Sequence, residues 1–134
     1  MSTLRSQDFC RVLCRAVVEH HQIDLLAKRV TLSANVTDAD TTEHYLVAFN
    51  GVTSFGWVSE DPKQRDRMEL SVIGLERPDG PQGDWQVYLN PWYTTEIEFQ
   101  CSEITINGAE LLYDGDCLQD SLPEIHEGET DMDA

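Results

Sequence analysis

The chain has 134 residues, with 25 Asp and Glu against nine Lys and Arg, and a formal net charge of −16. Its length predicts one domain, and its apolar fraction of 40% suffices for a small core, which argues against a wholly disordered acidic polymer. No apolar run approaches the roughly 20 residues that a membrane-spanning helix needs. Nucleic acid and anionic membranes repel a protein this acidic, so we expect neither as a direct partner. The first residues lack the apolar stretch of a secretion signal, so we expect a cytoplasmic protein.

A helix over residues 7–19 is the first predicted element, with Ser6 as its N-cap. Its apolar residues follow the i, i+3, i+4, i+7 spacing of one helix face: Phe9, Val12, Leu13, Ala16 and Val17. The apolar face is wide, which indicates that this helix lies in a groove of the domain.

After this helix the apolar pattern changes to the alternation typical of half-buried strands. The predicted strands lie at residues 30–36, 45–49, 52–58, 68–75, 85–89, 97–101 and 109–113. Polar loops are predicted at 37–43 and 60–67, and Asn107-Gly108 is typical of a tight hairpin turn. These elements do not alternate between helix and strand. They therefore predict an α+β fold, with one N-terminal helix packed on a mostly antiparallel β-sheet of six or seven strands.

The net charge lies mainly in the second half of the chain. Residues 1–77 hold 11 acids and nine bases, whereas residues 78–134 hold 14 acids and no Lys or Arg. We predict a single domain over residues 1–113 and a partly disordered acidic tail over residues 114–134, in which Leu118 and Leu122 would dock one helical turn. The acidity serves either solubility or the attraction of a basic partner, and the sequence leaves both interpretations open.

The cysteines and acids show no metal-binding motif. Cys10 and Cys14 are one helical turn apart and could hold zinc with His20 or His21, but they lie on the apolar helix face, so we expect buried thiols instead. The acids that begin at Asp114 do not match a calcium-binding EF-hand loop. We therefore predict no cofactor and no metal, and because no nucleophile–base motif accompanies the histidines, we predict that the protein is not an enzyme.

The segment 92–106 is the strongest candidate for a binding surface. In its strand, Glu96 and Glu98 share one face, and no basic residue in the second half of the chain is available to pair with them. Trp92 and Tyr93 come just before these acids, as aromatic anchors beside a charged rim would, although they could also cap the core. The full set of predicted partner-binding residues is Trp92, Tyr93, Glu96, Glu98, Glu103, Asp114 and Asp116.

Three segments together resemble a known class of protein. They are His20-His21, then Tyr45-Leu46-Val47-Ala48-Phe49-Asn50-Gly51-Val52, then Glu96-Ile97-Glu98-Phe99-Gln100-Cys101-Ser102-Glu103-Ile104-Thr105-Ile106. In this order, over roughly residues 20–112, they are similar to small bacterial immunity-type proteins of polymorphic toxin systems. The resemblance implies a non-enzymatic protein that binds and blocks a cognate toxin, often a basic nuclease.

Three functional hypotheses follow. The first is an acidic binding protein, such as an immunity protein or inhibitor, that occludes a basic toxin or nucleic-acid-binding effector. The second is a structural or adaptor module whose acidity serves only solubility, and the third is a small metal-dependent enzyme that uses the acids around 114–120. The sequence does not indicate an oligomeric state.

Overall fold

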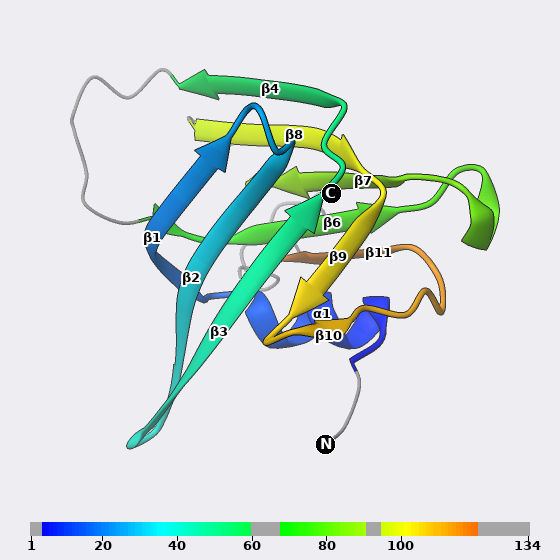
Figure 1. Cartoon of the computed structure of the whole chain (residues 1–134). Helices are drawn as coiled ribbons and strands as arrows, with labels where there is room; N and C mark the ends of the chain where they lie inside the picture. The colour runs from blue at the N-terminus through cyan, green and yellow to red at the C-terminus, as the bar shows by residue number, and fades with distance from the viewer. Residues whose placement is uncertain (1–3, 60–67, 91–94, 121–134) are drawn as a thin grey trace, which may run out of the picture.

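The computed structural model describes residues 4–59, 68–90 and 95–120, which form one helix and two antiparallel sheets (Figure 1). The elements, in chain order, are α1 (Ser6–Leu13), β1 (Val17–Asp24), β2 (Arg29–Asp38), β3 (Thr41–Asn50), β4 (Ser54–Ser59), β5 (Met68–Glu69), β6 (Val72–Glu76), a 3-10 turn (Gly80–Gln82), β7 (Trp85–Leu89), β8 (Thr95–Cys101), β9 (Glu103–Ile106), β10 (Ala109–Glu110) and β11 (Cys117–Asp120). The prediction of an α+β fold with an N-terminal helix and mostly antiparallel strands is confirmed.

The strands form two sheets, so the prediction of a single sheet of six or seven strands is wrong. The six-stranded sheet has the order β10-β9-β3-β2-β1-β5, and the five-stranded sheet has the order β11-β6-β7-β8-β4. The chain passes between them at short corners, because only Ser102 separates β8 from β9 and only two residues separate β5 from β6. Such corners let one continuous segment contribute to both layers.

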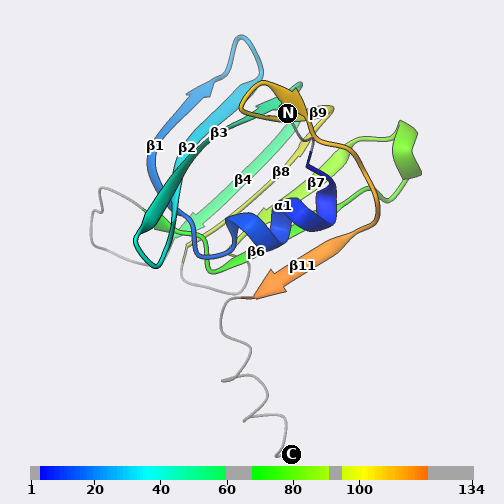
Figure 2. The same ribbon diagram turned by 90° about the horizontal axis from the view of Figure 1, so that it is seen from below.

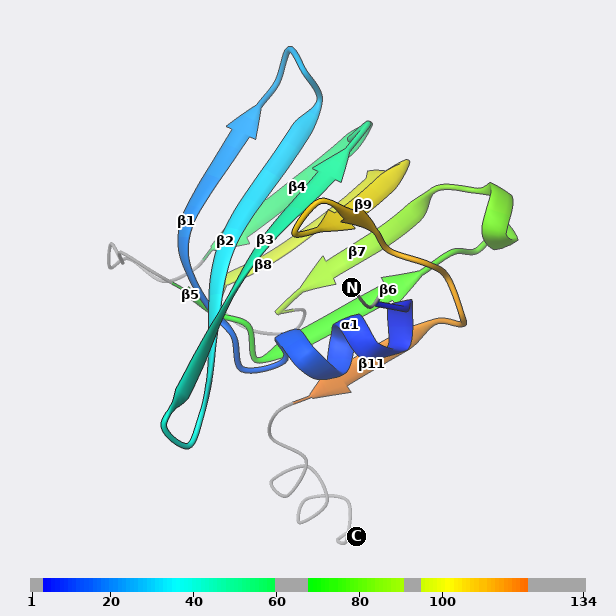
Figure 3. The ribbon, with the colours of Figure 1, turned by 60° about the horizontal axis from the view of Figure 1, so that its bottom comes forward.

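The core lies between the two sheets. From the six-stranded sheet it contains Val30, Leu32, Val47 and Phe49, and from the five-stranded sheet Ile73, Leu75, Trp85, Val87, Leu89 and Phe99. The rings of Phe49 and Phe99 meet edge to face, with centroids 4.8 Å apart, and so join the layers. Figures 2 and 3 show α1 beside β6 and β11, where it adds Phe9, Cys10 and Leu13 to the core.

The predicted helix over residues 7–19 is too long. α1 ends at Leu13, Arg15 takes a positive φ of 80°, and its N–H donates to the carbonyl of Leu70 (2.7 Å). Val17 and Val18 then begin β1, where they pair with β2 and β5. The apolar spacing continues past the end of the helix because Ala16, just before β1, is buried and Val17, the first residue of β1, is half-buried.

The predicted loop over residues 37–43 is also wrong, because β2 and β3 continue to a tight turn. Thr37 pairs with Thr42 and Asp38 with Thr41, and Ala39 has a positive φ of 57°. The threonines fit a strand, since their branched side chains suit a pleated surface. The hairpin predicted at Asn107-Gly108 is confirmed, since both residues have positive φ and Ala109 pairs with Ile106.

The first part of the predicted tail belongs to the fold. Instead of the expected helical turn, Leu118 lies in β11, which pairs antiparallel with β6. The expectation of a buried thiol is wrong for Cys10, which forms a disulfide with Cys117. A separation of 107 residues hides this pairing in the sequence, and only the packing of α1 beside β11 brings the two cysteines together. Residues 121–134 lie outside the described residues.

Candidate protein-binding face

The outer face of the five-stranded sheet gathers the acidic side chains of β6 and β8. Ile73, Leu75, Val87, Leu89 and Phe99 point into the core, so their neighbours along each strand point outward. Strand register aligns Glu76 with Gln86 and Gln100 in one row, and Tyr88 with Glu98 in the next. We call this surface the acidic face; it consists of Glu76, Gln86, Tyr88, Glu96, Glu98 and Gln100.

Tyr88 lies between the carboxylates of this face. Its hydroxyl donates to Oε1 of Glu76 at 3.3 Å, and it lies directly opposite Glu98 on the neighbouring strand. Partial burial raises the pKa of Tyr88, and the negative charges of Glu76 and Glu98 raise it further, together with the hydrogen bond to Glu76. The acidic face therefore has a negative potential that acts on the phenol between the carboxylates.

Within the described residues, no cation compensates this face. Arg77 follows β6 directly, but its guanidinium stacks 4.3 Å from the centroid of the Trp85 ring. Arg11 pairs with Asp8 on α1, and Arg29 donates from Nε to Asn50 at 2.9 Å on the six-stranded sheet. Glu96 and Glu98 form no hydrogen bond and no ion pair with another described residue.

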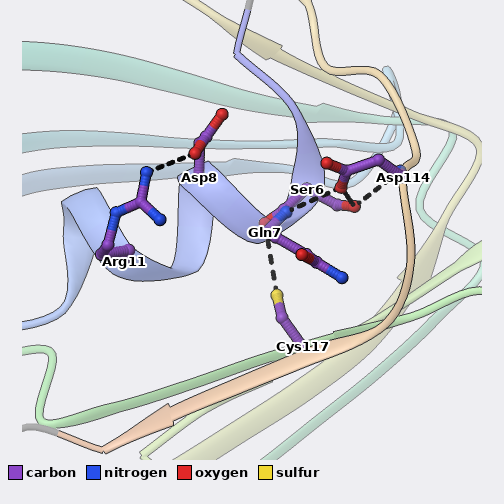
Figure 4. A network of polar contacts seen from close by, with 6 residues as sticks. All are labelled: Ser6, Gln7, Asp8, Arg11, Asp114 and Cys117. Atoms are coloured by element: carbon purple, nitrogen blue, oxygen red, sulfur yellow. Dashed lines mark hydrogen bonds and ion pairs between the residues drawn. The ribbon is translucent and has the colours of Figure 1, made fainter.

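The structure separates the other predicted acids from this face. Glu103 lies on the six-stranded sheet, where its Oε1 accepts a hydrogen bond from Nδ2 of Asn50 (3.0 Å). Asp114 accepts hydrogen bonds at Oδ1 from the Ser6 hydroxyl (2.8 Å) and the Gln7 N–H (3.1 Å) at the start of α1 (Figure 4). Asp116 accepts from the Arg77 N–H (3.0 Å) and the Tyr113 hydroxyl (2.8 Å). These three carboxylates thus have partners within the fold.

Two of the predicted residues lie where the structure gives no description, and two residues of the acidic face were not predicted. Trp92 and Tyr93 lie outside the described residues, so their prediction stays open. Sequence reasoning missed Glu76 and Tyr88. Alternation along β6 and β7 indicates that both point outward, but only the register of the strands shows that they adjoin Glu98.

Exposed apolar side chains lie on β4, at the edge of the sheet whose outer side carries the acidic face. Phe55 is 41% exposed and Trp57 is 66% exposed. Both occupy positions of the inner surface, where Phe55 stacks on Phe99 with centroids 5.7 Å apart. A groove of about 210 Å³ runs between Phe55 and the β1–β2 hairpin, whose Ile23 and Leu25 help to line it.

Neither a metal-binding cluster in the described residues nor the comparison with known proteins points to another functional site. No group of three or more His, Cys, Asp or Glu in the described part of the chain is arranged to hold a metal ion. Nor does any helix in that part have the length and apolar character needed to cross a membrane. Comparison with protein-family models and with curated proteins finds no match for this chain.

Proposed function

We propose that this protein binds a basic protein through the acidic face and blocks that partner by covering its cationic surface. The observation that carries the proposal is the group of Glu76, Glu96 and Glu98 on one sheet face, none of which forms an ion pair with a Lys or Arg of the described residues. Neighbouring carboxylates on one sheet face repel each other. A partner that supplies positive charge relieves this repulsion and is attracted over a distance by the opposite potential.

The class of partner follows from the same charge. Proteins that act on nucleic acid carry Lys and Arg to contact phosphates, and an acidic surface competes for those residues. An immunity protein or inhibitor of a nucleic-acid-processing toxin is therefore the function we propose, and the resemblance to immunity-type proteins supports it. Occlusion of this kind requires no catalytic group in the inhibitor.

The experiment compares two charge-reversed proteins with the unmodified chain. Glu96→Lys with Glu98→Lys alters the acidic face, and Asp40→Lys with Glu110→Lys makes the same change of charge at two exposed positions, in the β2–β3 turn and on β10. Each protein is immobilised to capture partners from the native host. We expect the unmodified protein and the control to retain a basic protein that the Glu96/Glu98 variant loses.

The captured partner then gives the quantitative test. Its association rate constant should fall steeply as salt increases, and for the Glu96/Glu98 variant it should fall by about tenfold or more. The unmodified protein should also inhibit the partner's activity on nucleic acid. An acidic partner, binding that salt leaves unchanged, or equal binding by all three proteins would contradict the proposal and favour an adaptor module.

A further inference from the structure

The free edge of β4 is unusual for a natural sheet. In the described part of the chain β4 pairs only with β8, so its other side presents unpaired N–H and C=O groups. The strand Ser-Phe-Gly-Trp-Val-Ser contains no charged residue and no proline, although natural edge strands commonly use both to prevent further pairing. Its length of six residues is also that of an ordinary paired strand.

The two surfaces of β4 differ in chemical character, so they favour different side chains on a strand added along its free edge. On the inner surface the exposed rings of Phe55 and Trp57 offer apolar contacts. On the outer surface Gly56 lies directly opposite Glu98. Because glycine has no side chain, nothing on β4 at this position stands between the Glu98 side chain and a strand placed along the free edge.

We infer that the edge of β4 accepts an extended segment of the basic partner as an additional strand. This inference rests on the proposed function and specifies how the partner binds. The segment would alternate apolar residues, directed toward Phe55 and Trp57, with Lys or Arg, one of which is directed toward Glu98 across Gly56. Adjacent strands are about 4.8 Å apart, so an added strand lies two strand spacings from β8. A long cationic side chain and a glutamate reach each other across that distance when the residue between them is glycine.

Charge complementarity favours a basic partner over a second copy of this chain. If two β4 strands paired antiparallel about Gly56, each Phe55 would lie opposite Trp57 of the other copy, and glycine would lie opposite glycine. No residue of β4 carries a positive charge, so neither copy would bring a cation to the outer surface. A second copy would therefore leave Glu98 without a cation and bring together two chains of net charge −16.

The test measures binding of two capped peptides of about eight residues to the full chain. When a peptide adds to a sheet edge as a strand, specificity comes from its alternate side chains, so the order of residues in the peptide should affect binding. One peptide alternates valine and lysine, and the other has the same composition with the residues in pairs. We expect the alternating peptide to bind about tenfold more tightly than its isomer, a ratio that corresponds to about 1.4 kcal/mol. It should also slow amide hydrogen exchange in β4, whose free N–H groups become hydrogen-bonded.

Two single substitutions with the same charge change locate the site. Gly56→Lys places a cation beside Glu98 from within the chain, and a β-carbon there would make ordinary contact, 3.6 Å from Cγ of Glu98. Thr42→Lys makes the same change of charge at an exposed position of β3, on the six-stranded sheet and away from the acidic face. We expect Gly56→Lys to remove the preference for the alternating peptide and Thr42→Lys to keep it.

The outcomes separate this inference from the proposed function. Suppose the captured partner binds through Glu96 and Glu98, while exchange in β4 stays fast and both peptides bind alike. The acidic face is then the binding site, and strand addition is wrong. Dimerisation of the free protein with protected β4 amides would also overturn the inference, because a second copy would occupy the edge. If charge reversal at Glu96 and Glu98 leaves binding of the captured partner unchanged, the proposed function is wrong, whatever the result with the peptides.

Discussion

At the scale of single residues, the two ends of the described chain meet at the start of α1. Ser6 is the first helical residue rather than the expected N-cap, and Arg5, which precedes it, makes no capping hydrogen bond through its side chain. The cap comes from Asp114, which accepts hydrogen bonds from the Gln7 N–H and the Ser6 hydroxyl. A carboxylate at this position also interacts favourably with the positive end of the helix dipole.

The pH dependence of stability tests this cap. The hydrogen bond from the Gln7 N–H, followed by that from Ser6, lowers the pKa of Asp114 below its ordinary value of 3.8. A lowered pKa in the folded state means that this carboxylate stabilises the fold fully above pH 3.8, and that the contribution is lost as pH falls through the lowered value. Asp114→Ala should therefore reduce the free energy of unfolding in urea at neutral pH, and the difference from the unmodified protein should shrink in acid. Glu110→Ala, which removes an exposed carboxylate, is the control; a loss at Asp114 that is equal at both pH values would contradict the cap.

At the scale of elements, the corners between the two sheets limit which residues fit. Gly51 follows β3 with a φ of +70°, and a β-carbon there would lie 2.2 Å from Oγ of Ser102, the residue between β8 and β9. The N–H of Ser102 donates to the carbonyl of Asn50 at 2.9 Å, which holds the two corners together. The absence of a side chain at Gly51 therefore lets these two connections approach each other.

Replacing Gly51 by alanine tests this approach. The positive φ alone costs a non-glycine residue about 1–2 kcal/mol, and the overlap with Ser102 adds to it, so we expect a loss of about 2 kcal/mol or more. Gly108→Ala is a matched control, because Gly108 has a φ of +88° but a β-carbon added there would have nothing within 4 Å. Urea unfolding should show a larger loss for Gly51→Ala than for Gly108→Ala, and Ser102→Ala should recover part of the excess. Equal losses at the two glycines would contradict close approach.

The disulfide joins α1 to β11 and closes most of the chain into one loop. Cys10 and Cys117 are 107 residues apart, and Sγ of Cys117 lies 3.2 Å from the carbonyl oxygen of Ser6. Because a disulfide sulfur carries no proton, this approach is a packing contact and not a hydrogen bond. A cross-link of this length chiefly restricts the unfolded chain, and for about 100 residues the chain-entropy account gives about 4.7 kcal/mol.

Reduction of this bond tests its contribution. A reductant should lower the free energy of unfolding of the unmodified protein by about 2–4 kcal/mol, measured by urea denaturation. The double variant Cys10→Ser with Cys117→Ser should be insensitive to the reductant. Peptide mapping without reduction should recover the linked pair, whereas a reductant-insensitive wild-type protein would show that the bond does not form.

At the scale of the whole molecule, contacts between the sheets anchor the strand that carries Glu96 and Glu98. Phe99 is 2% exposed; it meets Phe49 of the opposite sheet and stacks with Phe55 of β4. Its neighbours on β8, Glu98 and Gln100, point outward. The same strand therefore anchors the core with one side and presents the proposed binding surface with the other.

Truncation of Phe99 tests this link between the layers. Phe99→Ala should lower the free energy of unfolding by about 3–5 kcal/mol, because it removes apolar contacts from both sheets and leaves a cavity. Gln100→Ala, the next residue on the outward side, should change it by less than about 0.5 kcal/mol. Comparable losses for the two variants, measured by urea denaturation, would contradict the placement of Phe99 between the sheets.

The sequence alone determined the features that depend on neighbouring residues. Alternation of apolar and polar residues predicts the strands at 30–36 and 85–89 and their buried sides, because side-chain direction repeats every two residues. Asn107-Gly108 predicts its turn because positive φ is a property of those two residues. The concentration of acids after Arg77 is likewise evident from the sequence.

The tertiary structure alone decided which distant residues become neighbours. It divides the strands into two sheets, ends α1 at Leu13, joins Cys10 to Cys117 and places Asp114 at the start of the helix. It also brings Glu76 and Tyr88 beside Glu98, while it directs Glu103 and Asp116 to partners within the fold. Strand order and register depend on packing between segments far apart in the chain, and local periodicity carries no information about that packing.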